Sequence, residues 1–273
     1  FFFDFCKGCN LRGCQKMLSC LARSHIPKHC RPFSSQVAPL KILVVGGNGY
    51  VGSTICRIGV ERGLQVAALS RGGRLYSPAQ ADQPWAKEVT WLKGDVMDRD
   101  AWRAHLCSDT TAVISSVGAF GSNAFMEQVC GDTNIAACEE AAAAHVPRFV
   151  FVSAHDYRLI GHGVGPLKGY FNGKRRVERR VRELYPSGGH VLQPSFVYGT
   201  RHHGTMKIPL GLVGAPLEAL CALAPVKALA RLPILDLPFT SPVSVEAVAR
   251  TAIKGAVGEL EKPVLTVDDI LQN

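Results

Sequence analysis

The stretch that decides the fold is Lys41–Gly52, which reads KILVVGGNGYVG. It opens with Lys41–Gly46, a continuous apolar run rich in β-branched residues. Such a run is typical of a strand buried on both faces of a parallel sheet. A helical pattern follows over Tyr50–Arg62 and stops at Gly63. Strand, glycine-rich turn and helix in this order predict the first βα unit of a parallel α/β fold.

The turn between this strand and helix carries Gly46, Gly49 and Gly52 with the spacing G-x-x-G-x-x-G. Glycines here let the backbone approach a pyrophosphate, whose charge then lies against the N–H groups that begin the helix. A glycine triad alone is weak evidence, but the flanking strand and helix are the context it needs. The sequence therefore predicts a nicotinamide dinucleotide site on this loop. Its residues are Gly46, Gly47, Asn48, Gly49, Tyr50, Val51 and Gly52.

The end of the second predicted strand bears on which dinucleotide binds. A site selective for NAD usually places an acid there for the ribose hydroxyls. This chain has Leu69-Ser70-Arg71 instead, with Arg74 nearby and no acid. We therefore expect Arg71 to pair with a 2′-phosphate, which favours NADP and leaves NAD open. The simpler alternative is that Arg71 is a solvated loop residue.

The rest of the chain alternates between strand and helix patterns. Strands are expected at Gln65–Ser70, Val89–Lys93, Ala112–Ser116, Arg148–Ser153 and His190–Pro194, and long helices at Asn123–His145 and Tyr170–Leu184. This alternation predicts an α/β, doubly wound parallel sheet of the Rossmann type over residues 39–200. After about residue 200 the rhythm is lost and prolines recur. Residues 201–273 are therefore predicted to form a small, partly helical C-terminal lobe for substrate or partner.

Positive charge is concentrated at the start of the chain. The net charge is +9, yet residues 1–41 hold seven lysines and arginines and a single acid, Asp4. A nucleic-acid-binding protein carries its charge in the folded part, so no nucleic-acid partner is expected. Met17–Leu40 contains no acid, which is typical of an organelle transit peptide. We expect residues 1–38 to be a removable leader. The segment 31–35 resembles a mitochondrial processing site, which predicts the mitochondrion, with the plastid as the alternative.

Two further stretches bear on partners. Residues 174–182 carry six lysines and arginines and one acid. This pattern indicates either a solvated helix face or contact with an anionic lipid surface or an acidic partner. Met206–Ile234 is apolar but broken by four prolines, so it cannot cross a bilayer as a regular helix. It either covers a pocket or rests on a membrane surface. No histidine pair has metal-ligand spacing around a carboxylate, so no metal site is predicted.

Several motifs together resemble a known family. They are the glycine loop, Gly94-Asp95-Val96, Ser153, Tyr170-Phe-Asn-Gly-Lys174 and the segment from Gln193 to Gly199, QPSFVYG. The chain resembles the extended or atypical branch of the short-chain dehydrogenases/reductases over residues 40–270. Within that branch it is similar to a plant and fungal group of organellar NAD(P)-binding proteins. This group is related to the nucleotide-binding accessory subunit of mitochondrial complex I and to an accessory protein of the coenzyme Q synthesis complex.

The resemblance implies roles for individual residues. Asp95 would meet the adenine, Tyr170 would donate a proton, and Lys174 would hold the ribose and lower the pKa of Tyr170. That chemistry is sound, because an ammonium stabilises a phenolate and residues four apart share one helix face. Ser153 would be the third catalytic member, with Ser115, Ser116 and Ser195 as rivals. Further cofactor contacts are expected from Ser115, Ser116, Val117, Gly118 and Pro194.

Two functions follow from these expectations. The first is a nucleotide-binding accessory factor of ubiquinone biosynthesis or respiratory-complex assembly, as part of a complex at the inner mitochondrial membrane. The alternative is an NADPH-dependent reductase or isomerase that uses Tyr170 and Lys174 on a quinone-related or isoprenoid substrate. An intact Tyr170/Lys174 pair favours the enzyme, whereas the resemblance favours the accessory factor, since fold alone does not establish chemistry.

Overall fold

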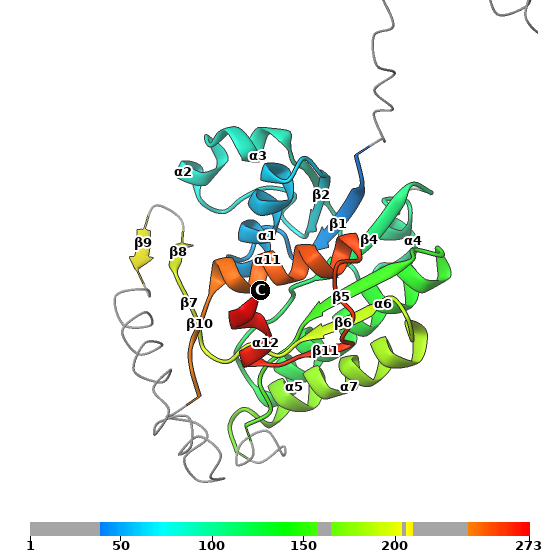
Figure 1. Cartoon of the computed structure of the whole chain (residues 1–273), viewed down its shortest axis with the longest axis vertical. Helices are drawn as coiled ribbons and strands as arrows, with labels where there is room; N and C mark the ends of the chain where they lie inside the picture. The colour runs from blue at the N-terminus through cyan, green and yellow to red at the C-terminus, as the bar shows by residue number, and fades with distance from the viewer. Residues whose placement is uncertain (1–38, 107, 158–164, 204–205, 210–239) are drawn as a thin grey trace, which may run out of the picture. The chain divides into compact units, whose positions relative to one another are not determined.

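The computed structural model describes residues 39–106, 108–157, 165–203, 206–209 and 240–273, all within one compact unit, Pro39–Asn273. Its centre is a seven-stranded sheet in which every neighbouring pair is parallel (Figure 1). The strand order is β11-β6-β5-β4-β1-β2-β3. The strands are β1 (Lys41–Val45), β2 (Gln65–Ser70), β3 (Thr90–Lys93), β4 (Thr110–Ser115), β5 (Arg148–Val152), β6 (Gly189–Leu192) and β11 (Val264–Leu265). This order confirms the predicted doubly wound Rossmann sheet.

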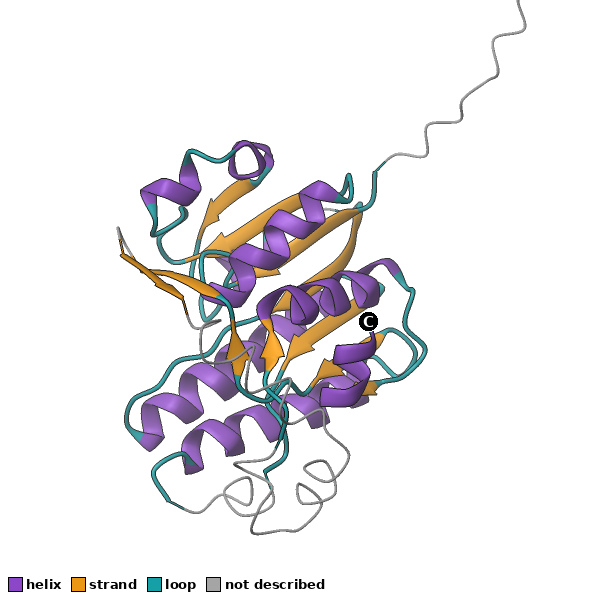
Figure 2. Ribbon diagram, turned by 60° about the vertical axis from the view of Figure 1, so that its left-hand side comes forward, coloured by secondary structure: helices purple, strands orange, loops and turns teal. Residues whose placement is uncertain are grey.

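Helices cover both faces of the sheet (Figure 2). On one face lie α1 (Tyr50–Glu61) and α11 (Val245–Val257), and on the other lie α6 (Thr133–Ala143) and α7 (Lys168–Leu184). Successive side chains of β1 enter opposite cores, as the period of two in a strand requires. One core includes Ile42, Val44, Ile55 and Val248, and the other includes Leu43, Val45, Ala137 and Val177. A strand buried on both faces has to be apolar throughout, which explains the uninterrupted run in β1.

Shorter elements complete the described part of the chain. The helices are α2 (Pro78–Ala81), α3 (Pro84–Glu88), α4 (Arg99–Arg103), α5 (Asn123–Glu127) and α12 (Val267–Gln272). Two small sheets lie outside the main one. The first pairs β7 (Val197–Tyr198) with β10 (Val243–Ser244) in parallel, and the second pairs β8 (Thr200–His203) with β9 (Met206–Pro209) in antiparallel fashion. Among the described residues, no helix is long and apolar enough to cross a membrane.

The C-terminal region differs from the separate lobe expected over 201–273. β11 extends the main sheet beside β6, and α11 packs directly against α1. Each helix buries part of the apolar face of the other. Residues 240–273 are therefore part of the Rossmann core. The segment 210–239, with most of the apolar stretch Met206–Ile234, lies outside the described residues, as does the leader 1–38.

The long helix expected over Asn123–His145 is interrupted. Between α5 and α6 the chain forms a π-helical turn, η1 (Gln128–Asp132). The turn lies where the helix backbones touch, because a Cβ on Gly131 would be 3.0 Å from the Cα of Gly173 on α7. The Asn134 amide donates to the carbonyls of Val129 and Cys130 at 3.2 and 3.0 Å. These bonds satisfy carbonyl groups that a regular α-helix would have paired.

Candidate dinucleotide site

The glycine loop between β1 and α1 is folded too tightly for side chains. Gly46 has φ +81°, in the left-handed region that favours glycine. A Cβ on Gly52 would lie 2.2 Å from the Gly46 carbonyl oxygen, and one on Gly47 would lie 2.6 Å from the Ala68 Cβ. These glycines hold α1 and β2 against the loop. A Cβ on Gly49 would meet the same Gly46 oxygen only at 3.2 Å, so Gly49 is less constrained by packing.

The loop ends in unpaired hydrogen-bond donors. The α1 helix begins after Gly49 without a side-chain cap and without an acid in its first turn. Its first N–H groups therefore lack the usual side-chain partner. The Asn48 Nδ2 atom is also buried without a hydrogen-bond partner in the described part of the chain. A buried unsatisfied donor is costly, and a pyrophosphate on this loop would accept from both sources. The residues present thus fit a dinucleotide.

A groove of about 340 Å³ runs along the carboxyl ends of the strands β1 to β4. Ligands of doubly wound sheets bind at this edge. Eight of the residues expected to touch the cofactor line this groove: Gly46, Asn48, Gly49, Arg71, Asp95, Ser116, Val117 and Gly118. The structure therefore brings together residues from four separate strand ends, as a bound dinucleotide requires.

The other expected cofactor residues lie outside the groove lining. Gly47, Val51 and Gly52 shape the loop from behind, and Tyr50 lies beside a small adjoining cavity. Ser115 is fully buried, where its hydroxyl donates to Asn134 at 2.6 Å. Pro194 is also buried, and its carbonyl accepts from the His155 N–H at 2.8 Å. Ser115 and Pro194 thus make internal contacts here. Ser116, the neighbour of Ser115, lines the groove, and no neighbour of Pro194 is among its described lining residues.

Among the groove residues that were not expected to contact the cofactor are three large, exposed apolar side chains. Tyr76, Met97 and Phe125 line the groove and are 63, 48 and 42% exposed. Large apolar side chains this exposed are unusual unless something covers them. Met97 comes two residues after Asp95, so its place beside a strand end could have been predicted. Tyr76 lies on a segment whose path the sequence pattern does not fix. Phe125 lies in the predicted helix Asn123–His145, but the pattern does not give the position of that helix beside the groove.

Lys174 is almost fully buried behind the groove wall. Its Nζ donates to the carbonyls of Val152 at 2.7 Å and Val117 at 3.2 Å, and it lies 4.6 Å from the centre of the Phe151 ring. Burial disfavours the charged ammonium and lowers the pKa of Lys174 to about 8. The ammonium thus lies beside the strand end where the nicotinamide ribose was expected. In this structure it donates its hydrogen bonds to two backbone carbonyls instead.

Tyr170 lies on the same helix, and its ring stacks on that of Phe120 at 5.2 Å. The Lys174 Nζ is 5.9 Å from the centre of the Tyr170 ring. Burial raises the pKa of the Tyr170 phenol. Removal of the phenol from water outweighs the nearby Arg175 guanidinium, which acts to lower this pKa. The expectation that Lys174 lowers the pKa of Tyr170 stays a prediction for the protein with its cofactor bound.

The Ser153 hydroxyl has a different partner on α7. Its hydroxyl donates at 2.5 Å to the carboxylate of Glu178, which is buried on α7. The same carboxylate accepts two hydrogen bonds from Gln193 at 3.1 Å and pairs with Arg175. Ser153 therefore belongs to a buried polar network that joins β5, β6 and α7. The structure brings Tyr170 and Lys174 together on one helix and binds the Ser153 hydroxyl to Glu178, and the catalytic role of Ser153 stays a prediction.

The sheet, the glycine loop and the groove define a nucleotide-binding Rossmann protein, and sequence comparison narrows the class. Residues 46–188 match the family described as NAD(P)H-binding. An uncharacterised chloroplastic protein of Arabidopsis thaliana is 35% identical over 232 residues, which cover 84% of this chain and 76% of that protein. The chain therefore belongs to the NAD(P)H-binding family.

Shorter matches extend to two named proteins. MIOREX complex component 2 of Saccharomyces cerevisiae is 37% identical over 79 residues, 29% of this chain and 28% of that protein. The 2-alkyl-3-oxoalkanoate reductase of Stenotrophomonas maltophilia is 36% identical over 120 residues, 42% of this chain and 33% of that protein. None of the three names supports ubiquinone biosynthesis or the mitochondrion.

Solved structures share the fold at low sequence identity. A short-chain dehydrogenase/reductase family oxidoreductase of Burkholderia thailandensis superposes with a TM-score of 0.58 at 15% identity, covering 86% of this chain and 94% of that one. An enzyme of Bordetella bronchiseptica in complex with NAD+ has a TM-score of 0.57 at 15% identity, covering 83 and 74% of the two chains. At this identity the likeness concerns the fold alone.

Proposed function

We propose that this protein is an NADP-binding accessory protein of an organelle, in which the bound dinucleotide stabilises the fold and little or no turnover takes place. The observation that carries the proposal is the contrast at Ser153. The dinucleotide groove has its loop, helix N-terminus and strand ends in place, whereas the Ser153 hydroxyl is bound to Glu178 at 2.5 Å. This contrast supports a role in binding ahead of a role in proton transfer.

The choice of NADP rests on Arg71. This arginine lines the groove just after β2, where an NAD-selective protein would place an acid. It makes no ion pair with any other described residue. A 2′-phosphate would supply two negative charges at that point, and a charge-assisted contact of this kind is strong. We expect NADPH to bind more tightly than NADH, with Arg71→Gln narrowing the difference by about tenfold.

Accessory function can be tested by separating binding from proton transfer. Gly49→Val should remove the stabilisation of the purified protein by NADPH, because the side chain would occupy the space of the phosphates. Tyr170→Phe keeps the ring on Phe120 and should leave that stabilisation unchanged. In cells lacking the protein, Tyr170→Phe should restore function and Gly49→Val should not. Rescue by Gly49→Val together with failure of Tyr170→Phe would refute the proposal.

A second candidate is the NADPH-dependent reductase or isomerase, favoured by one specific observation. Lys174 is buried with a pKa of about 8 and shares a helix with Tyr170 beside the Val117–Gly118 wall. The S. maltophilia relative is itself named a reductase. For this candidate, Tyr170→Phe should lower turnover by about 10²–10⁴-fold with cofactor affinity unchanged. A quinone-related or isoprenoid-linked carbonyl remains the substrate class to try first.

The organelle and the partner complex are also part of the proposal. One relative is named chloroplastic and another a complex component, which supports an organellar protein that works in an assembly. Reporter fusions of Met17–Leu40 should therefore enter an organelle. Entry into plastids alone would exclude the mitochondrial version, in which the complex serves ubiquinone biosynthesis or the inner membrane. A reporter that stays in the cytosol would exclude both.

A further inference from the structure

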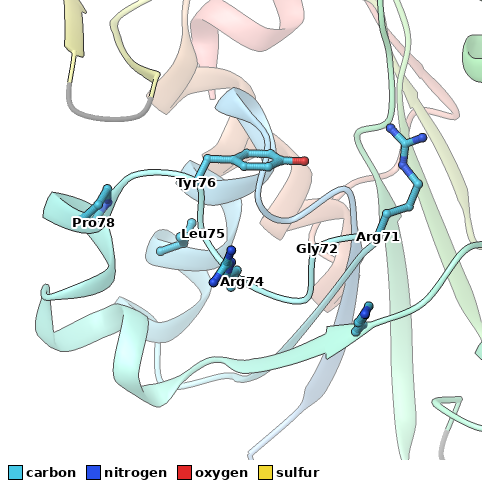
Figure 3. A pocket seen from close by; sticks show the side chains of 7 residues that line it. Arg71, Gly72, Arg74, Leu75, Tyr76 and Pro78 are labelled. Atoms are coloured by element: carbon cyan, nitrogen blue, oxygen red, sulfur yellow. The ribbon is translucent and has the colours of Figure 1, made fainter.

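A second cavity opens beside the dinucleotide groove. It has a volume of about 750 Å³, and its lining includes Arg71, Arg74 and Lys93 together with Leu75, Tyr76 and Pro78 (Figure 3). Arg71 and Tyr76 also line the groove, so the two spaces share a wall. In Figure 3 the Arg71 side chain points away from Arg74, which lies beyond Gly72. Arg71 thus lines both spaces, whereas Arg74 and Lys93 line the cavity and not the groove.

The cavity is held in shape by the backbone around it. Gly73 has φ +62°, and a Cβ there would lie 2.7 Å from the Lys93 Cβ and 3.1 Å from its Cα. The loop after β2 therefore lies directly against the end of β3. The Gly73 N–H donates to the Ser70 carbonyl at 3.2 Å and to its hydroxyl at 3.1 Å. Leu75 and Ser77 are buried and anchor the loop further along. The backbone segments that carry Arg74 and Lys93 are thus held next to each other before any ligand arrives.

The charges of the cavity are of one sign. Among the described residues, no aspartate or glutamate lines it, and neither Arg74 nor Lys93 makes an ion pair. Cations gathered on one wall repel one another and raise the local concentration of anions. Arginine and lysine are the usual side chains that bind phosphate. Beside them the Tyr76 ring is 63% exposed and offers an apolar surface.

We propose that this cavity is a phosphate-monoester site in which Arg74 and Lys93 bind the phosphate and Tyr76 contacts the group that carries it. Two sources share this chemistry: the 2′-phosphate of the cofactor, and a separate phosphorylated small molecule. With the cofactor as source, the inference rests on the proposed function and makes Lys93 a specificity-determining residue supplied by β3. With a separate molecule as source, the shared Arg71–Tyr76 wall couples its binding to that of the dinucleotide.

The first arm of the test measures NADPH and NADH affinities for the wild type, Arg74→Gln and Lys93→Gln. Each side chain is exposed, so the variants should fold. Lys87→Gln is the matched control, because Lys87 is an exposed lysine on α3 outside the cavity. If the 2′-phosphate is the ligand, each cavity variant should weaken NADPH by about tenfold and leave NADH unchanged, since one charge-assisted bond is worth about that factor.

The second arm uses phenyl phosphate, which joins a phosphate monoester to a ring, on protein saturated with NADH. Phenol and inorganic phosphate serve as the two half-probes. If a separate molecule is the ligand, phenyl phosphate should bind the wild type and Lys87→Gln at low ionic strength. It should bind Arg74→Gln and Lys93→Gln about tenfold more weakly, and Tyr76→Ala should remove its advantage over inorganic phosphate.

The outcomes separate the two proposals. Weakening of NADPH alone assigns the cavity to the 2′-phosphate, and weakening of phenyl phosphate alone assigns it to a separate molecule. If neither cavity variant changes the affinity of either probe relative to Lys87→Gln, the phosphate site is refuted. A wild type that binds neither nucleotide yet holds phenyl phosphate refutes the proposed function and leaves the cavity assignment standing.

Discussion

The two ends of the cofactor region are built differently, although both lie at the carboxyl edge of one sheet. At the glycine-loop end, the Asn48 Nδ2 atom has no hydrogen-bond partner in the described chain, and α1 begins without a side-chain cap. At the Tyr170 end, the Ser153 hydroxyl and the Lys174 ammonium already have partners within the protein, although the Arg175 Nε atom is buried without one. Ser153 is bound to Glu178, and Lys174 is bound to two backbone carbonyls.

This difference indicates which end of the cofactor region is arranged to bind a ligand. Unpaired donors cost free energy in the empty protein, and a ligand recovers that cost on binding. Partnered groups stabilise the fold but must give up a hydrogen bond before they can serve a substrate. The glycine-loop end is therefore organised for a ligand, and the Tyr170 end is organised for stability. This reasoning supports a binding role ahead of a catalytic one.

The largest expected effect distinguishes a glycine that the fold needs, Gly52, from one that nucleotide binding needs, Gly49. Gly52→Val would drive a side chain into the Gly46 carbonyl at 2.2 Å, so the backbone must move. We expect a loss of about 3 kcal/mol or more in the free energy of unfolding. Gly49→Val, whose Cβ would be 3.2 Å from the same oxygen, should fold and lose only the nucleotide. Urea unfolding beside nucleotide titration would show this, and equal stability of both variants would contradict it.

The next effect concerns the network at the second end. Glu178→Gln keeps the shape of a buried side chain but leaves Arg175 with Asp156 as its remaining acid, 3.3 Å away. Breaking a buried pair on one side is costly, and we expect a loss of about 2–3 kcal/mol with nucleotide affinity unchanged. Glu183→Gln, in an exposed pair with Arg180, is the control and should cost little. A loss of nucleotide affinity in Glu178→Gln would show that the two ends are coupled.

The glycine-loop end of the cofactor region could be predicted from the sequence. Gly46, Gly49 and Gly52 have a fixed spacing between a strand and a helix, and that spacing alone determines how the backbone turns. Arg71 and Asp95 follow strand ends, and parallel strands end at one edge, so their meeting in the groove could be predicted. The doubly wound parallel sheet followed from the alternation of β and α patterns, whereas the place of β11 beside β6 did not.

The hydrogen-bond partners at the Tyr170 end could not be predicted in the same way. Ser153 and Tyr170 were placed on their elements correctly, but the partner of Ser153 is Glu178, one turn beyond Lys174. Sequence spacing gives which helix face a residue occupies, not which of two nearby groups a hydroxyl selects. The π-helical turn is similar: it depends on contact between Gly131 and Gly173, which are distant in sequence. The place of α11 beside α1 was likewise hidden, because the proline-rich residues before it carry no periodic pattern.

A smaller effect follows from the titration of Lys174. Its folded pKa is about 8 and its ordinary value 10.5, so between these pH values the unfolded chain binds more protons than the folded one. Stability attributable to Lys174 therefore rises with pH across this window, by at most about 1.4 kcal/mol per pH unit. Lys174→Met should remove that rise. Urea unfolding of both proteins from pH 7 to 10.5 gives the difference, and parallel curves would show that the ammonium is not desolvated.

The smallest expected effect tests whether the basic helix α7 binds anionic lipid. Three of its arginines are already engaged: Arg175 with Glu178, Arg176 with Asp132 at 2.8 Å, and Arg180 with Glu139 and Glu183 at 3.0 Å. Arg179 and Arg182 are exposed and make no ion pair with a described residue.

Each cation near an anionic surface contributes only about a fivefold gain in affinity at low salt, and screening removes most of it at physiological ionic strength. We therefore expect weak binding to cardiolipin-containing vesicles at low salt and none at about 0.15 M salt. Arg179→Gln combined with Arg182→Gln should abolish the low-salt binding, whereas Arg57→Gln on α1, which is paired with Glu61, should not change it. Vesicle flotation measures both. Binding that survives the double substitution would mean that the membrane contact lies elsewhere in the chain, and α7 would then be a face stabilised by its own ion pairs.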